Sequence, residues 1–112
     1  MSAAPDIVLA SEFAEVLAMH LGANVRRISL FGSRARRDQN RHSDFDLMIV
    51  LDSPTGALRS LIHSLALQWE LERRVDLSTK ILSFADFSTG IESIHTFWKN
   101  YRKDERILWT MT

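Results

Sequence analysis

The chain has 112 residues, of which 46% are hydrophobic and 25% charged, and we expect one small globular domain over 1–112. Its 14 basic residues balance 14 acidic ones, so no direct nucleic-acid binding is expected, because that needs a net positive field. The sequence has no cysteine, which excludes disulfides and thiolate zinc sites. It also has no secretory leader pattern and no apolar run that could span a membrane, so we expect a cytoplasmic location.

The spacing of apolar residues predicts helices and strands in alternation, an α/β sandwich with few strands. The strand over 45–51 is apolar on both faces beyond Asp46, which favours a central place in the sheet. In chain order we predict a helix over 5–21, a strand over 25–31, a short helix over 34–38 capped by Ser33, a loop over 39–43, the strand over 45–51, a helix over 55–72, a strand over 75–78, a helix over 83–103 interrupted near 89–90, and a strand over 106–109.

Two acidic residues, Asp44 and Asp46, stand at the start of that central strand. Alternate side chains of a strand share a face, so both carboxylates project the same way while Phe45 turns into the core. Carboxylates so close repel each other and resist burial unless a cation joins them, and Mg²⁺ prefers such oxygen ligands. The alternative is that these residues only form part of the turn before the strand, since Asp-x-Asp sequences are common by chance.

The junction Gly32-Ser33 presents free backbone N–H groups and the positive end of a helix dipole, which favour an anion. Glycine lets a phosphate approach the backbone, and the Ser33 hydroxyl can add a hydrogen bond. Taken alone, a solvated basic helix with a serine cap explains the turn as well. A nucleoside triphosphate with magnesium would satisfy both the turn and the acidic pair. The arginines that follow are Arg34, Arg36, Arg37 and Arg41.

A third carboxylate, Asp76, lies in the short apolar strand over 75–78. If this strand pairs beside 45–51, Asp76 meets Asp44 and Asp46, where it could bind the metal and accept a proton. The alternative is an edge-strand carboxylate that faces water.

These residues together resemble the minimal nucleotidyltransferases of the DNA polymerase beta-type nucleotidyltransferase superfamily. The resemblance rests on Gly32-Ser33, then Asp44-Phe45-Asp46 and later Asp76, and it covers nearly the whole chain. It implies a mixed sheet of about four strands flanked by helices, with ATP as substrate and two Mg²⁺ ions. It further implies that Asp44, Asp46 and Asp76 are the catalytic, metal-binding triad and that Gly32, Ser33 and Arg34 bind the nucleotide.

This sequence departs from the family pattern at two places. Many members have glycine where this chain has Arg37, and many have Glu-Gly where it has Glu105-Arg106. Neither departure touches the acidic triad, so we expect activity to be retained.

Small members of this superfamily often stand beside a HEPN-domain toxin and act as its antitoxin by adding AMP to one of its tyrosines. The resemblance therefore implies a protein adenylyltransferase with a HEPN-domain partner, and it leaves a homo- or hetero-oligomer open. Two alternatives remain: transfer to a small molecule such as an antibiotic, and a non-catalytic antitoxin that works by binding. A group of apolar residues near the end of the chain forms either a contact surface for a partner or part of the core: Phe84, Phe87, Ile94, Phe97 and Trp98.

Overall fold

The structure of the chain is a computed structural model that describes residues 5–36 and 44–111. These residues form one four-stranded sheet in the order β3-β2-β1-β4, which confirms the predicted mixed sheet. Strand β2 pairs antiparallel with β1 and parallel with β3, and β1 pairs antiparallel with β4. The strands are β1 (Val25–Phe31), β2 (Phe45–Leu51), β3 (Leu77–Ser83) and β4 (Arg106–Thr110).

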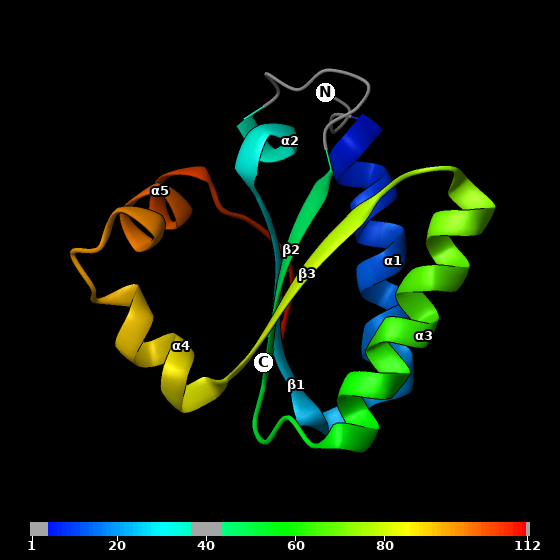
Figure 1. Cartoon of the computed structure of the whole chain (residues 1–112), viewed down its shortest axis with the longest axis horizontal. Coiled ribbons are helices and arrows are strands. Elements are labelled where there is room, and N and C mark those ends of the chain that lie inside the picture. Colours follow the sequence, from blue (N-terminus) through cyan, green and yellow to red (C-terminus); the bar gives the residue numbers. More distant parts are fainter. Residues whose placement is uncertain (1–4, 37–43, 112) are drawn as a thin grey trace.

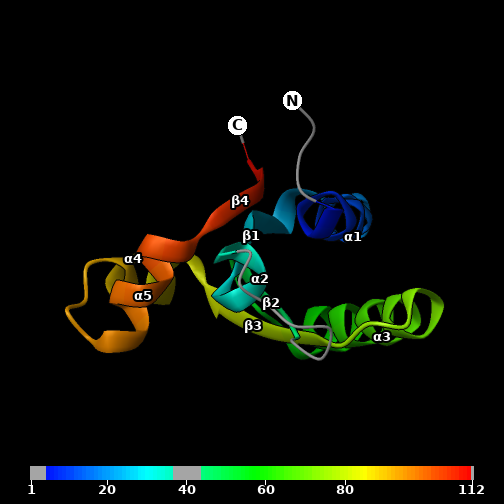
Figure 2. The same ribbon diagram turned by 90° about the horizontal axis from the view of Figure 1, so that it is seen from above.

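Helices cover both faces of this sheet (Figure 1). Helices α1 and α3 lie on one face and α4 and α5 on the other, as the view from above also shows (Figure 2). Short helix α2 stands at the end of the sheet where β1 ends and β2 begins. The helices are α1 (Pro5–Leu21), α2 (Gly32–Arg36), α3 (Gly56–Arg73), α4 (Phe84–Ile91) and α5 (Thr96–Asp104), with a 3₁₀ turn, η1 (Gly22–Asn24), after α1.

The main core lies between the sheet and helices α1 and α3. Phe13 of α1 and Trp69 of α3 pack with ring centroids 5.1 Å apart, and Phe45 of β2 meets the same indole at 5.9 Å. A second core under α4 and α5 contains Phe87 and Tyr101. Strand β2 is therefore buried on both faces beyond Asp46, which confirms its predicted central place.

Several predicted boundaries were wrong. Strand β3 begins at Leu77 and not at Val75, because Arg74 ends α3 in the left-handed conformation. Glu70 then holds the next residues: its carbonyl accepts a hydrogen bond from Val75 N–H, and its carboxylate accepts one from Leu77 N–H. The short helix begins at Gly32, so Ser33 lies inside it instead of capping it. The predicted end of that helix and the loop over 39–43 fall outside the described residues.

The last helical stretch is also interrupted later than predicted. Gly90 stays inside α4, and the break falls at 92–95. A Cβ atom at Gly90 would lie 2.1 Å from the Trp98 ring, so this glycine serves the close packing of α5 on α4 and not a turn. None of the helices in the described ranges is long and apolar enough to cross a membrane.

Candidate active site

The turn at Gly32 brings the end of β1 against an acidic side chain of β2. Gly32 has φ +75°, a backbone conformation that residues with a side chain disfavour. A Cβ atom here would lie 2.3 Å from Oδ2 of Asp46, whose backbone pairs with that of Phe31. Any side chain at position 32 would thus displace the Asp46 carboxylate. The predicted anion turn and the acidic strand are therefore in direct contact.

Asp44 and Asp46 act on each other electrostatically at the start of β2. Asp44 is exposed and Asp46 is half-buried. Burial, and after it the negative charge of Asp44, raises the pKa of Asp46 above its ordinary value, while the positive charge of Arg36 opposes the rise. A cation held between the two carboxylates would offset both the desolvation cost of Asp46 and the repulsion between the two charges. This donor set fits a divalent, oxygen-binding ion such as Mg²⁺.

Asp76 lies beside this pair at the start of the neighbouring strand. Its carbonyl accepts a hydrogen bond from Phe45 N–H at 2.8 Å, and the parallel register pairs Asp46 with Ser78. The predicted proximity of β3 to β2 is thus confirmed, although Asp76 precedes β3 and is exposed. Among the described side chains, no three acidic or histidine groups already form a closed metal cluster. The backbones of the three acidic residues are therefore close to one another, at the starts of two paired strands.

The arginines of the turn point in different directions. Arg34 donates to both carboxylate oxygens of Asp6 at 3.2 Å and lies 4.4 Å from the Phe45 ring centroid, on the α1 side of β2. Arg36 donates to Asp104 at 2.7 Å, and its charge reaches Asp46. Arg36, one of the four arginines predicted to lie beside the anion-binding turn, thus acts on Asp46 through its charge. Nucleotide binding by Arg34 stays a prediction, and Arg37 and Arg41 lie outside the described residues.

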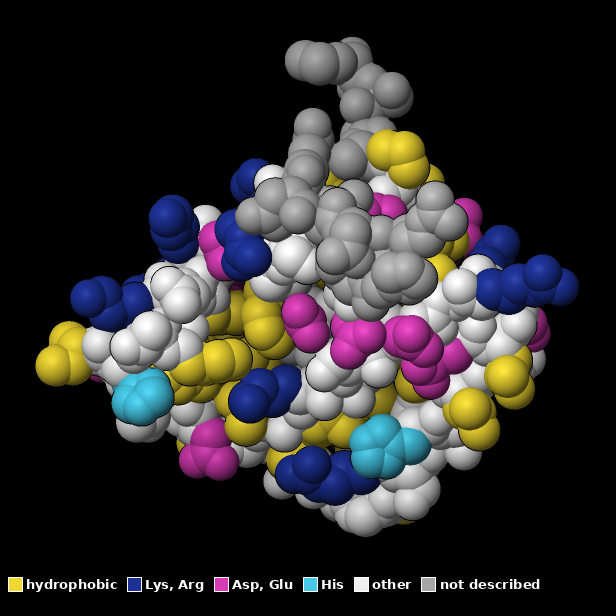
Figure 3. Space-filling model, turned by 45° about the horizontal axis from the view of Figure 1, so that its top comes forward, with side chains coloured by type: hydrophobic (Ala, Val, Ile, Leu, Met, Phe, Trp, Pro, Cys, Tyr) yellow, Lys and Arg dark blue, Asp and Glu magenta, His cyan; other side chains and the backbone are white. Residues whose placement is uncertain are grey.

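Acidic side chains gather on the surface at this end of the sheet. In the view of this face they lie near the centre, and Lys and Arg side chains surround them on both halves of the molecule (Figure 3).

Comparison with known proteins decides the family. The family model of the nucleotidyltransferase domain matches residues 10–108. The chain belongs to this nucleotidyltransferase family. In sequence it is 28% identical over 93 residues to MJ0435 of Methanocaldococcus jannaschii, a proposed protein adenylyltransferase, and the match covers 83% of this chain and 88% of that protein.

Solved structures share the nucleotidyltransferase fold. A toxin–antitoxin complex with AMP-PNP matches with a TM-score of 0.59 at 17% identity, over 91% of this chain and 74% of the other. A proposed nucleotidyltransferase from Sulfolobus solfataricus matches with a TM-score of 0.57 at 21% identity, over 98% and 92%. The complex of a tri-AMPylated Shewanella oneidensis HEPN toxin with its MNT antitoxin matches with a TM-score of 0.54 at 15% identity, over 94% and 73%. The chain is a nucleotidyltransferase with the fold of these proteins.

A largely buried polar network lies beneath α5. The Glu105 carboxylate accepts hydrogen bonds from Arg27 Nε at 3.0 Å, from Ser29 Oγ at 2.8 Å and from the Tyr101 hydroxyl. Burial by itself raises the pKa of Glu105, but the hydrogen bonds from Arg27, Tyr101 and Ser29 outweigh it, so the pKa lies below its ordinary value. The network ties β1, which ends at the Gly32 turn, to α5.

Sequence reasoning missed this network. Arg27 and Ser29 lie 78 and 76 positions from Glu105, so no local pattern joins them. The signal that could have found them is the pair of polar residues, Arg27 and Ser29, that alternate on one face of strand β1.

Proposed function

We propose that this nucleotidyltransferase moves AMP from ATP to a protein acceptor, a tyrosine of a HEPN-domain toxin, for which it serves as antitoxin in the cytoplasm. The observation that carries the proposal is the close approach of the Gly32 turn to the Asp46 carboxylate, since the proposal assigns triphosphate binding to the turn and cation binding to the acidic pair. The naming of MJ0435 as a proposed protein adenylyltransferase supports a protein acceptor. The shared fold with an antitoxin of an AMPylated HEPN toxin is consistent with this role.

In this proposal the chain's own groups hold and orient the reactants. Backbone N–H groups at Gly32 and the Ser33 hydroxyl hold the triphosphate. The oxygen of the acceptor hydroxyl forms a bond to the α-phosphorus of ATP, the bond from that phosphorus to the bridging oxygen of the β-phosphate breaks, and pyrophosphate leaves. The Asp76 carboxylate takes the proton of the hydroxyl. Asp44, Asp46 and Asp76 would hold two Mg²⁺ ions, which would neutralise phosphate charge.

Intact-mass measurement tests the proposal directly. The chain is incubated with ATP, Mg²⁺ and a HEPN-domain protein from the same genome, and the HEPN protein should gain the mass of one or more AMP units. The variant Asp44→Ala/Asp46→Ala should lose this activity. Asp52→Ala is the matched control, because Asp52 is an exposed carboxylate at the opposite end of β2. The proposal fails if the HEPN protein gains no mass, or if the double variant transfers AMP as well as the control does.

A toxicity assay separates catalysis from inhibition by binding. Cells that express the HEPN protein should be rescued by the unaltered chain and not by a variant that lacks the carboxylates of Asp44, Asp46 and Asp76. Rescue by that variant would show that covering the toxin suffices.

A further inference from the structure

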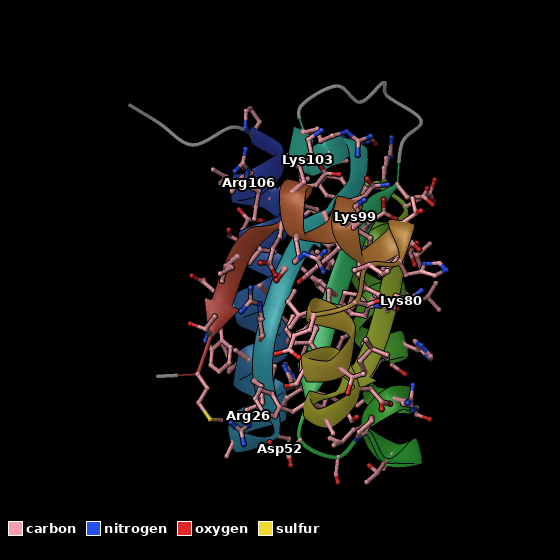
Figure 4. The ribbon with its side chains drawn as sticks, turned by 90° about the vertical axis from the view of Figure 1, so that its left-hand side faces the viewer. Arg26, Asp52, Lys80, Lys99, Lys103 and Arg106 are labelled. Atoms are coloured by element: carbon pink, nitrogen blue, oxygen red, sulfur yellow. The ribbon has the colours of Figure 1, made fainter. Side chains whose placement is uncertain are left out.

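The three lysines of the sequence lie on the α4 and α5 side of the molecule, beside the acidic site. Lys80 is on β3, and Lys99 and Lys103 are on α5; we call these three residues the lysine ridge. Figure 4 shows them in a row that runs from the end of α5 toward β3, with Arg106 on the other side of α5. All three side chains are exposed.

The lysine ridge has a defined position relative to the active site. The parallel register pairs Asp46 with Ser78 and Met48 with Lys80, so Lys80 shares the face of β2 and β3 on which Asp46 projects. The ammonium group of Lys80 lies 4.7 Å from the Phe97 ring centroid, which joins β3 to α5. The ion pair of Arg36 with Asp104 joins α5 to α2 at 2.7 Å. The ridge therefore borders the acidic site on elements that are packed to it.

The positive charge of this ridge is not balanced from within. Over 5–36 and 44–111 no ion pair involves Lys80, Lys99 or Lys103. Lys99 and Lys103 are four residues apart on one helix, where like charges destabilise by about 0.2–0.5 kcal/mol. The acids next to them in sequence are engaged elsewhere, Asp104 by Arg36 and Glu105 by Arg27. The three ammonium groups are therefore exposed to solvent and open to the carboxylates of a partner.

We infer that the lysine ridge binds an acidic surface of the acceptor protein and so places that protein's hydroxyl group at Asp76. This inference rests on the proposed function, since it concerns the acceptor of that transfer. A protein fits better than a nucleic acid, because the chain has no net charge and because the aromatic rings of α5 are committed to the core. Phe97 packs on Phe31 at 5.8 Å, and Trp98 packs on Phe87 at 5.8 Å, so neither offers a free platform for bases.

Charge reversal tests the inference. The variant Lys80→Glu/Lys99→Glu is compared with Arg59→Glu/Arg74→Glu, which makes the same change in net charge at exposed positions of α3 and its end. Unfolding in urea first verifies that both are folded. Calorimetry then measures the Kd of each for the HEPN-domain protein at low and moderate salt. The ridge variant should bind about 10-fold or more weakly than the control, and its Kd should depend less on salt.

Four outcomes would overturn the inference. One is equal Kd values for the ridge and control variants, and another is no binding by the unaltered chain. The third is a KM for ATP that rises with the KM for the acceptor, which would make the ridge part of the triphosphate site. Binding of a fluorescent single-stranded RNA that only the ridge variant loses would likewise assign the ridge to nucleic acid.

Measuring both the Kd and the transfer of AMP keeps this inference separate from the proposed function. Asp44→Ala/Asp46→Ala should bind the HEPN-domain protein with unchanged Kd although it transfers no AMP. If no form of the chain transfers AMP but binding depends on the ridge, the proposed function falls and the ridge remains a binding surface. If AMP is transferred and the ridge variant equals the control, the ridge inference falls alone.

Discussion

The two faces of the sheet differ sharply in chemistry, and strand β2 contributes to both. On the α1 and α3 side its residues Phe45, Leu47, Ile49 and Leu51 are all fully buried in an apolar core. On the α4 and α5 side the strand begins with the half-buried Asp46 before it reaches Met48 and Val50. One face therefore contributes packing alone, whereas the other also carries charged groups.

The charged residue of this strand, Asp46, therefore lies on the α4 and α5 side of the sheet. Charged groups under α4 and α5 are tolerated because each is matched, as Glu105 is by Arg27, Ser29 and Tyr101. The acidic pair is the exception, since burial and mutual repulsion act on Asp46 and the charge of Arg36 opposes them only in part. A carboxylate whose pKa is raised both by burial and by a neighbouring like charge is a candidate functional group.

The largest effect should come from the apolar face. Leu47→Ala, in the middle of β2, should lower the free energy of unfolding by about 2–5 kcal/mol, because it removes a fully buried side chain and leaves a cavity. Urea unfolding measures this loss. The activity per folded molecule should stay unchanged, and a specific loss of activity would mean that the two faces are not separable in function.

The next effect should come from the turn. Gly32→Ala should lower the rate of AMP transfer by about 100-fold, because its Cβ would displace the Asp46 carboxylate. Gly22→Ala is the matched control: Gly22 also has positive φ, but a Cβ there meets nothing within 4 Å. Both variants should lose about 1–2 kcal/mol of stability from backbone strain. Equal activity of the two variants would contradict the role assigned to the Gly32 contact.

A smaller effect should come from the network under α5. Glu105→Gln should lower the free energy of unfolding by about 1–3 kcal/mol at pH 7, because it leaves Arg27 without its buried counter-charge. The pKa of Glu105 is lowered in the folded state, so its contribution is present above the pKa of the unfolded chain and is lost as pH falls through the folded value. The stability difference between the chain and this variant should therefore shrink as the pH falls below the ordinary glutamate pKa of 4.5, as urea midpoints would show. A difference independent of pH would argue against the ionised carboxylate.

The smallest effect should come from the surface pair between Arg26 and Asp52. Both side chains are substantially exposed, at 40% and 45%. Asp52→Asn should change the free energy of unfolding by less than about 1 kcal/mol, since exposed ion pairs contribute little. A larger loss in urea unfolding would mean that this end of β2 is less solvated than its exposure indicates.

Elements with a strong local pattern could be predicted from the sequence. The bounds of α1, β1 and β2 agree with the predicted ranges, because their apolar residues recur at the helix or strand period. Strand β3 could not be bounded in this way, since its start depends on how Glu70 of the preceding helix holds Leu77. The break before α5 likewise involves a distant partner, since Arg102 donates hydrogen bonds to the carbonyls of Ile91 and Ser93, 11 and 9 positions away.

Strand alternation, a property of neighbouring residues, was enough to predict that Asp44 and Asp46 share a face and follow a Gly-Ser turn. The motif residues also predicted the family, which the match over residues 10–108 confirms. No local pattern showed that Gly32 closely approaches Asp46, that Arg34 pairs with Asp6 while Arg36 pairs with Asp104, or that three lysines border the site. Those contacts join distant parts of the chain, and their partners are selected by the order of the strands and the packing of helices on them.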